Sequence, residues 1–231
     1  MVKPVSISVQ YFYSMAVQLT SHELSQRYDR IARWYDRFEG ILGLFGVSRL
    51  RRRGLQHARG RVLEVAVGTG KNLSYYPRDC RIIAVDLSSE MLKVARERAA
   101  KLNINVHFSL ADGEALPFPD HRFDTVVSSL STCTFPNPVT ALKEMARVCR
   151  PKGKVLLLEH GRSDREWLGR WQDRHAEQFA KPLGCHWNRE PLELVRQTGL
   201  NVYQAKRSFF GIFQQIESLK IAPQPETGEL S

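Results

Sequence analysis

The stretch that decides the fold of this 231-residue chain is residues 61–86, RVLEVAVGTGKNLSYYPRDCRIIAVD. An apolar, β-branched run over 61–67 predicts a buried strand, and it stops at the glycine turn Gly68-Thr69-Gly70. A segment long enough for a helix follows, and a second apolar run over 82–85 ends at Asp86. A strand, a glycine turn, a helix and a second strand that ends in a carboxylate form half of a nucleoside-binding sheet.

The residues around this turn discriminate between two nucleoside cofactors. A dinucleotide fingerprint needs a third glycine, but Leu73 stands at that position and Ala66 precedes the turn. S-adenosylmethionine has no phosphates, so it needs only a close approach of the backbone and a carboxylate for its ribose. An acidic residue on the first strand also suits a cofactor that carries an ammonium and a sulfonium group. The pattern therefore favours S-adenosylmethionine over NAD, with predicted contacts at Glu64, Gly68, Gly70 and Asp86.

Three further motifs strengthen this interpretation. They are DLSSEML over 86–92, ADGEALPFPD over 111–120 and FDTVV over 123–127. Together they closely resemble the class I S-adenosylmethionine-dependent methyltransferases. The most similar branch contains the ubiquinone/menaquinone C-methyltransferases and the bacterial phospholipid N-methyltransferases, and the resemblance covers residues 26–205.

The resemblance implies roles for individual residues in a cofactor site. It assigns Asp86 to the ribose, Met91 to the adenine ring and Asp112 to the adenine amino group. The other contacts that we assign with it are Tyr28, Leu87, Gly113 and Ser129. The chain departs from the family at Ala66, where glycine is usual, so we expect the methyl group to crowd the methionine moiety and to weaken binding.

The alternation of patterns predicts an α/β fold. We expect a Rossmann-like class I methyltransferase sheet, mostly parallel with an antiparallel last strand, and helices on both faces. Further strands are predicted near 104–109, 123–130, 154–159, 201–207 and 210–218. Further helices are predicted over 88–101, 138–149, 164–181 and 189–198, the first capped by Ser88 or Ser89 and the last by Asn188. The predicted domains are an N-terminal arm and lid helix over 1–47, a methyltransferase domain over 48–221 and a disordered tail over 222–231.

The strongest helical pattern covers residues 22–46. Apolar side chains recur there every three or four residues, which puts them on one helix face: Tyr28, Ile31, Tyr35, Phe38, Leu42 and Phe45. Arg30, Arg33 and Arg37 form a neighbouring basic stripe. Such a helix can simply pack on the sheet, or it can also lie in a lipid interface. In the resembled family this region covers the cofactor pocket, so we expect a lid.

Composition indicates one soluble, cytoplasmic domain, since 42% hydrophobic residues is ordinary for a chain that buries a single core. The cysteines at 80, 133, 149 and 185 lack a metal-binding spacing such as C-x-x-C and are interpreted as free thiols. The group His175, Cys185 and His186 has no such spacing either, so we predict no metal site. The longest apolar run, over 40–47, is far shorter than the roughly 20 residues that cross a bilayer.

The net charge of +10 is unevenly distributed. Residues 1–60 hold ten Lys/Arg against four Asp/Glu, and residues 48–61 hold six arginines and no acidic residue. Such a patch can meet phospholipid headgroups, face solvent or bind nucleic acid. No alternation of basic and aromatic residues typical of an RNA-binding module accompanies it. An anionic membrane surface is therefore the leading partner, with peripheral attachment, and nucleic acid is the weakest.

Methyl transfer from a sulfonium is an in-line displacement, so it depends mainly on holding the nucleophile close to the methyl carbon and excluding water. Candidate groups at the carboxyl ends of the strands are Tyr35 on the lid, Glu159 and His160 after the fifth strand, and Cys133 after the fourth. His160 has a suitable unperturbed pKa for a base, although a structural histidine fits equally well. Cys133 fits packing better than chemistry. We assign catalytic roles to His160 and Tyr35.

The acceptor is less well determined. Residues 158–160, 171–172 and 184–190 resemble the insert of the thiol methyltransferase-like group, and the strand-end histidine also fits the phospholipid N-methyltransferases. Aromatic density favours an apolar or amphiphilic acceptor: Trp34, Phe38, Trp167, Trp171 and Trp187. A phospholipid amine such as phosphatidylethanolamine is the leading prediction, and a small alkyl thiol or a quinone precursor is the alternative. A catalytically silent methyltransferase fold that serves in assembly is the competing class, which the intact acidic and glycine residues disfavour.

Overall fold

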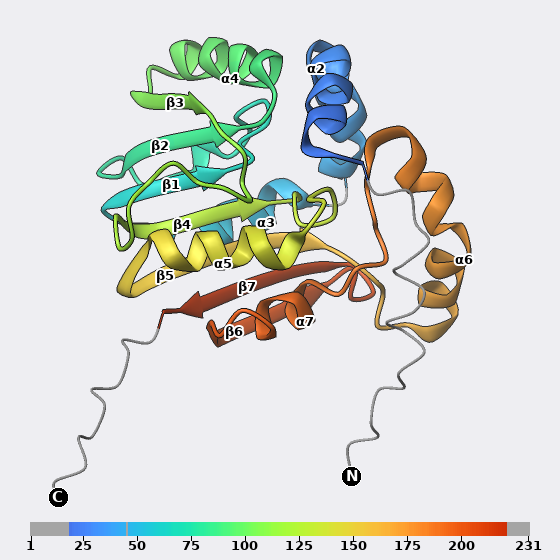
Figure 1. Cartoon of the computed structure of the whole chain (residues 1–231). Coiled ribbons are helices and arrows are strands. Elements are labelled where there is room, and N and C mark those ends of the chain that lie inside the picture. The colour runs from blue at the N-terminus through green and yellow to red at the C-terminus, as the bar shows by residue number, and fades with distance from the viewer. Residues whose placement is uncertain (1–18, 45, 221–231) are drawn as a thin grey trace, which may run out of the picture.

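The computed structural model describes residues 19–44 and 46–220, with residues 37–44 described by their backbone alone. The predicted N-terminal arm and the predicted C-terminal tail lie outside the described residues. Figure 1 shows one twisted sheet with helices packed around it.

The sheet has seven strands in the described part of the chain, in the order β3-β2-β1-β4-β5-β7-β6. The strands are β1 (Arg61–Val65), β2 (Arg81–Asp86), β3 (Val106–Leu110), β4 (Phe123–Ser129), β5 (Cys149–His160), β6 (Asn201–Ser208) and β7 (Phe213–Leu219). The first five pair in parallel, and β7 is antiparallel to both β5 and β6. The predicted fold class is confirmed.

The helices within residues 19–44 and 46–220 are α2 (Ser21–Leu44), α3 (Val47–Leu55), α4 (Ser89–Leu102), α5 (Pro138–Val148), α6 (Glu166–Leu183) and α7 (Pro191–Arg196), and the same residues hold one 3₁₀ turn, η1 (Leu73–Tyr75). Helices α5 and α7 pack on one face of the sheet, and α3 and α4 on the other (Figure 1). Helices α2 and α6 lie beyond the carboxyl ends of the parallel strands. None of the described helices is both long and apolar enough to cross a bilayer.

Two local predictions are wrong. The helix expected after the glycine turn is only η1, because Asn72 and Tyr76 turn inward to bind Glu64 and Pro77 stops the turn. Asn188 does not cap α7, which begins at Pro191, and its amide instead donates to Asp173. The Ser88 cap of α4 is confirmed, since its hydroxyl accepts the backbone N–H of Met91.

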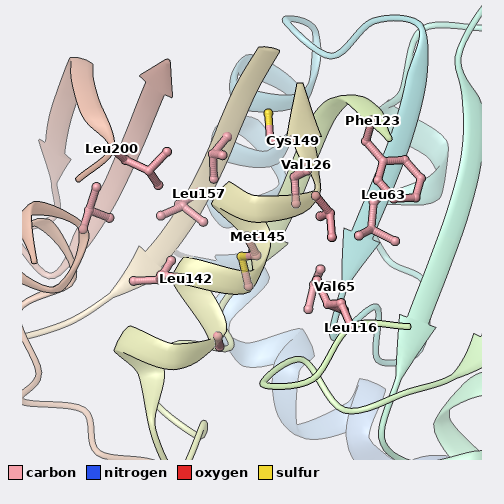
Figure 2. Packing of buried hydrophobic residues seen from close by; sticks show 14 of the residues in the cluster. Leu63, Val65, Leu116, Phe123, Val126, Leu142, Met145, Cys149, Leu157 and Leu200 are labelled. Carbon is pink, nitrogen blue, oxygen red and sulfur yellow. The ribbon is translucent and has the colours of Figure 1, made fainter. Parts of the chain in front are cut away.

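The main core lies between the sheet and α5 (Figure 2). Leu63 and Val126 of β1 and β4 are fully buried, as are Leu142 and Met145 of α5. Full burial of one such side chain contributes about 1.5–3 kcal/mol to stability. This packing holds β1, β4 and β5 in register and so fixes the strand ends that carry the site.

Candidate cofactor and acceptor site

A pocket opens at the carboxyl ends of β1, β2 and β4. Strand order reverses between β1 and β4, which is where α/β sheets bind their ligands. Most of the predicted site residues line this pocket: Tyr28, Tyr35, Gly68, Asp86, Leu87, Met91, Asp112, Gly113 and Ser129. The structure therefore gathers nine positions that the sequence spreads over about a hundred residues.

The glycine turn after β1 forms one wall. Gly68 has a φ of 55°, and a Cβ atom there would meet nothing within 4 Å because the residue faces the pocket. Gly70 has a φ of 78°, but its missing side chain makes room for Leu73, 2.9 Å from an ideal Cβ, and it does not line the pocket. Ala66 does line the pocket, in a left-handed conformation (φ 55°) that favours glycine. Weaker cofactor binding caused by its methyl group stays a prediction.

Asp86 ends β2 at the floor of the pocket. One carboxylate oxygen accepts the Gly68 N–H at 2.7 Å and the other accepts the Ser88 N–H at 2.9 Å. Burial raises the pKa of Asp86 to about 6, against the lowering effect of these hydrogen bonds. The hydrogen bonds fix the carboxylate where both oxygens can still meet the hydroxyls of a ribose. With the open face of Gly68 and the apolar side chains of Leu87 and Met91, this floor fits S-adenosylmethionine.

Glu64 lies one layer behind the pocket wall and does not line it. Its buried carboxylate accepts the Asn72 amide at 2.8 Å and the Tyr76 hydroxyl at 2.9 Å. The Asn72 side chain also donates to Ser129 and accepts a guanidinium N–H of Arg51. A direct contact of Glu64 with the cofactor's ammonium group stays a prediction. In the structure the Glu64 carboxylate is linked to the pocket lining only indirectly, through its hydrogen bond with Asn72.

Glu64 should make stability depend on pH with a sign opposite to that of an ion-paired carboxyl, whose pKa is lowered on folding. Burial raises its pKa from 4.5 to about 7, so its contribution to stability is present below the unfolded-state pKa and is lost as the pH rises through 7. Relative to Glu64→Gln, the wild type should therefore gain roughly 2–3 kcal/mol in unfolding free energy between about pH 8 and about pH 5. Urea unfolding of both proteins at the two pH values tests this. A difference between the two proteins that does not change with pH would contradict the argument.

Helix α2 covers the open side of the pocket. Leu24, Tyr28 and Tyr35 line the cavity from above, and the Ser25 hydroxyl donates to the Leu87 carbonyl at 3.0 Å. Asp29 accepts the Ser88 hydroxyl and the Glu90 N–H at the start of α4. Arg30, Arg33 and Trp34 point to solvent, whereas the side chains of Arg37, Phe38, Leu42 and Phe45 lie outside the described residues. This arrangement fits the predicted lid, whose opening and closing stay a prediction.

The catalytic candidates separate into two groups. Tyr35 lines the pocket, and its ring centroid lies 6.0 Å from that of Tyr28. His160 at the end of β5 does not line the pocket, and its Nε2 lies 3.5 Å from the Cys185 sulfur. Glu159 points into the protein, where its carboxylate accepts the backbone N–H groups of Ser131 and Thr132. The catalytic role of His160 stays a prediction. It would require the imidazole to take a proton from the acceptor although the ring does not line the pocket.

Two buried arginines were missed as site residues. Arg51 was counted in the exposed basic patch, but it is only 7% exposed, lines the pocket and binds Asn72. Arg189 is 3% exposed and donates to the carbonyl oxygens of Thr132 and Phe135, at 2.6 and 2.8 Å. A basic residue that faces inward leaves no periodic signal, although Arg189 lies within the motif 184–190 that resembles an insert of related enzymes.

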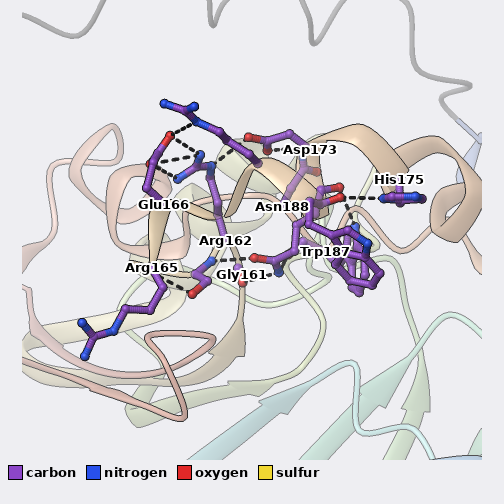
Figure 3. Close-up of polar contacts among 12 residues, drawn as sticks. Gly161, Arg162, Arg165, Glu166, Asp173, His175, Trp187 and Asn188 are labelled. Atoms are coloured by element: carbon purple, nitrogen blue, oxygen red, sulfur yellow. Dashed lines mark hydrogen bonds and ion pairs between the residues drawn. The ribbon is translucent and has the colours of Figure 1, made fainter. Parts of the chain in front are cut away.

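The connection that carries Arg189 is fastened to α6 (Figure 3). Gln172 donates to the carbonyls of Gly161 and Trp187, and the Trp187 indole donates back to the Gln172 carbonyl. Asp173 accepts from both Arg162 and Asn188. These bonds tie the end of β5, helix α6 and residues 184–190 into one unit beside the pocket.

Comparison with known proteins identifies the family. Residues 63–157 match the family model described as a methyltransferase domain. The chain is 36% identical over 188 residues to the phosphatidylethanolamine N-methyltransferase of Cereibacter sphaeroides, covering 75% of this chain and 92% of that protein. It is 30% identical over 184 residues to a ubiquinone/menaquinone biosynthesis C-methyltransferase of Cronobacter sakazakii, covering 75% and 73%.

The fold agrees with these relatives. A solved structure of a SAM-dependent methyltransferase from Thermotoga maritima superposes with a TM-score of 0.65 at 24% identity, covering 85% of this chain and 99% of that one. Three observations indicate the same family: the order of the strands, the position of the pocket between β1 and β4, and the sequence relatives. The chain therefore belongs to the class I S-adenosylmethionine-dependent methyltransferases, enzymes that take S-adenosylmethionine as their cofactor.

Proposed function

We propose that this methyltransferase acts on the primary amine of an aminophospholipid, collected at an anionic membrane surface. The observation that carries the proposal is a set of exposed aromatic side chains on the elements around the pocket end of the sheet. Trp34 of α2 is 55% exposed, Trp167 of α6 is 70% exposed and Phe210 of the β6–β7 turn is 62% exposed. Trp171, Phe179 and Phe209 belong to the same elements and are also exposed.

The position of these side chains supports an amphiphilic acceptor. Helices α2 and α6 and the β6–β7 turn all lie toward the carboxyl ends of the parallel strands (Figure 1). Large apolar side chains are normally buried, so several exposed together near a pocket indicate an interaction surface. Tryptophan and phenylalanine suit the boundary between water and acyl chains. The identity to a phosphatidylethanolamine N-methyltransferase supports the same class of acceptor.

Exposed arginines of α2 and α3 supply the charge. Arg49, Arg52 and Arg53 of α3 and Arg30 and Arg33 of α2 are exposed. Each basic residue near an anionic surface contributes about 1 kcal/mol, and salt screens the attraction. A few of them give reversible binding that depends on salt, which suits an enzyme that must collect and release lipid.

The chain's own groups perform the remaining tasks of the reaction. S-adenosylmethionine supplies an electrophilic methyl group. Asp86 holds the ribose, and α2 with residues 130–136 walls the pocket against water. Tyr35 lines the pocket, and we assign it to hold the amine nitrogen in line with the methyl carbon. The headgroup ammonium must release one proton to solvent before its nitrogen lone pair can attack the methyl carbon.

The test is methyl transfer from radiolabelled S-adenosylmethionine to vesicles. We expect label in phosphatidylethanolamine, with faster transfer when an anionic phospholipid is added and steep loss between low and moderate salt. The triple variant Arg49→Gln/Arg52→Gln/Arg53→Gln should lose roughly 1–3 kcal/mol of vesicle binding, about 5- to 150-fold, without changing cofactor affinity. Arg51 is left intact because it is part of the pocket.

The control is Arg59→Gln/Arg78→Gln/Arg122→Gln, since these exposed arginines precede β1, β2 and β4 at the opposite end of the sheet. It should bind vesicles like the wild type. An equal loss of vesicle binding in both triple variants would mean that the α3 arginines only face solvent and do not dock the enzyme on membranes. Transfer to small thiols or quinone precursors but not to lipid would replace the proposed acceptor, and no transfer to any of them would favour the silent assembly role.

A further inference from the structure

Two thiols and an imidazole converge behind the pocket wall. They are Cys133 in the loop after β4, His160 at the end of β5 and Cys185 in the loop after α6. Their sulfur and nitrogen atoms all lie within 4.8 Å of one another, and the Cys185 sulfur is 3.5 Å from His160 Nε2. The three residues come from separate segments, so only the folded chain brings them together.

The donor set and its spacing match one class of ligand. Two soft thiolates and an imidazole are the ligands that zinc takes in proteins, and two thiolates balance the charge of the dication. Tetrahedral zinc with bonds of about 2.3 Å to sulfur and about 2.0–2.1 Å to nitrogen puts those two atoms about 3.5 Å apart. The distance between Cys185 and His160 therefore already equals one edge of a zinc tetrahedron.

The backbone that carries these side chains is held by several hydrogen bonds. Glu159 accepts the N–H groups of Ser131 and Thr132, just before Cys133. The His186 N–H donates to the Cys133 carbonyl at 2.9 Å, which ties the two cysteine loops together. Arg189 fastens the loop after β4 from the other side. Partners of this kind orient ligand side chains in metal sites.

Metal binding would deprotonate both cysteines. Cys133 and Cys185 would each release a thiol proton to solvent as their sulfurs bond the ion.

We propose that Cys133, Cys185 and His160 bind one zinc ion. Zinc would join the loop after β4, the end of β5 and the loop after α6, and a fourth position would remain for water, as in zinc sites with three protein ligands. Tyr28 lines the pocket and lies near Cys133 and Cys185. The ion would therefore stiffen the pocket wall over 130–136. This inference holds whatever the acceptor is. It reverses the prediction of no metal site, which considered only spacing along the sequence. It also replaces the predicted role of His160 as a base, because the imidazole would bind the ion.

The experiment is a titration of the reduced, metal-free full chain with Co²⁺ alone, followed by Zn²⁺. We expect one equivalent of Co²⁺ to produce a thiolate-to-cobalt charge-transfer absorption and the visible bands of tetrahedral cobalt. One equivalent of Zn²⁺ should abolish both. Because the readout uses wild-type protein without cofactor or acceptor, it is independent of the proposed function.

Variants assign the signal to the cluster. Cys185→Ser and His160→Gln should each weaken Co²⁺ binding by more than the roughly 10–100-fold loss that outer partners cause. Cys80→Ser, a half-buried thiol away from the cluster, is the matched control and should titrate like the wild type. Three results would overturn the site: reduced wild type without a charge-transfer band, a band that survives in both cluster variants, or metal-free protein whose mass shows only a disulfide between Cys133 and Cys185.

Discussion

Asp86→Ala is expected to weaken S-adenosylmethionine binding by about 1.5–3 kcal/mol, a factor of roughly 10 to 150 in affinity. The carboxylate ends β2 at the pocket floor and is fixed by the Gly68 and Ser88 N–H groups. Alanine removes the predicted partner of both ribose hydroxyls and also leaves these two donors without their acceptor. Isothermal calorimetry with S-adenosylmethionine and with its demethylated product measures the loss.

A second variant separates charge from geometry. Burial raises the pKa of Asp86 to about 6, so wild-type affinity should fall as the pH drops through 6, because the protonated carboxyl accepts hydrogen bonds less well. Asp86→Asn should bind weakly with no such pH step. Asp79→Ala, an exposed acid just before β2, should bind like the wild type at every pH. Unchanged affinity in Asp86→Ala, with an unchanged melting temperature, would remove Asp86 from the ribose.

The cofactor half of the site was predictable because its signals are local. Gly68 must take a left-handed conformation and Asp86 must follow the second strand, and both requirements act within about twenty residues of sequence. The sheet order follows from the same pattern, since apolar strands that alternate with helices leave few topologies open. Predicted and observed strands accordingly agree along most of the sheet.

The buried residues behind the pocket wall could not be predicted from the sequence, because their positions depend on contacts between distant segments. Asn72 and Tyr76 leave the helix that their position suggests, since burying Glu64 requires two hydrogen-bond donors beside it. Cys133 and Cys185 meet His160 only after β4, β5 and α6 have packed. Arg51 and Arg189 resemble surface arginines in sequence, and only tertiary structure turns them inward.

Arg189→Met is expected to cost about 2–4 kcal/mol of unfolding free energy and to lower cofactor affinity as well. The guanidinium is 3% exposed and donates to the carbonyls of Thr132 and Phe135. Methionine keeps much of the apolar volume but leaves two buried acceptors without a donor, at roughly 1–3 kcal/mol each. Urea unfolding measures the loss of stability, and calorimetry measures the loss of affinity.

The affinity readout distinguishes a positioning role from a merely structural one. Thr134, Phe135 and Pro136 line the pocket, so a loop released by Arg189→Met should impair binding even at temperatures where the variant is fully folded. Arg196→Met, on the exposed side of α7, should change stability by less than about 0.5 kcal/mol and affinity not at all. Arg189→Lys should recover only part of the stability, because an ammonium lacks the planar fork that reaches both carbonyls. Wild-type cofactor affinity in folded Arg189→Met would mean that the loop after β4 holds its position without this arginine. The position of the pocket wall would then depend on Glu159 and the cysteine cluster instead.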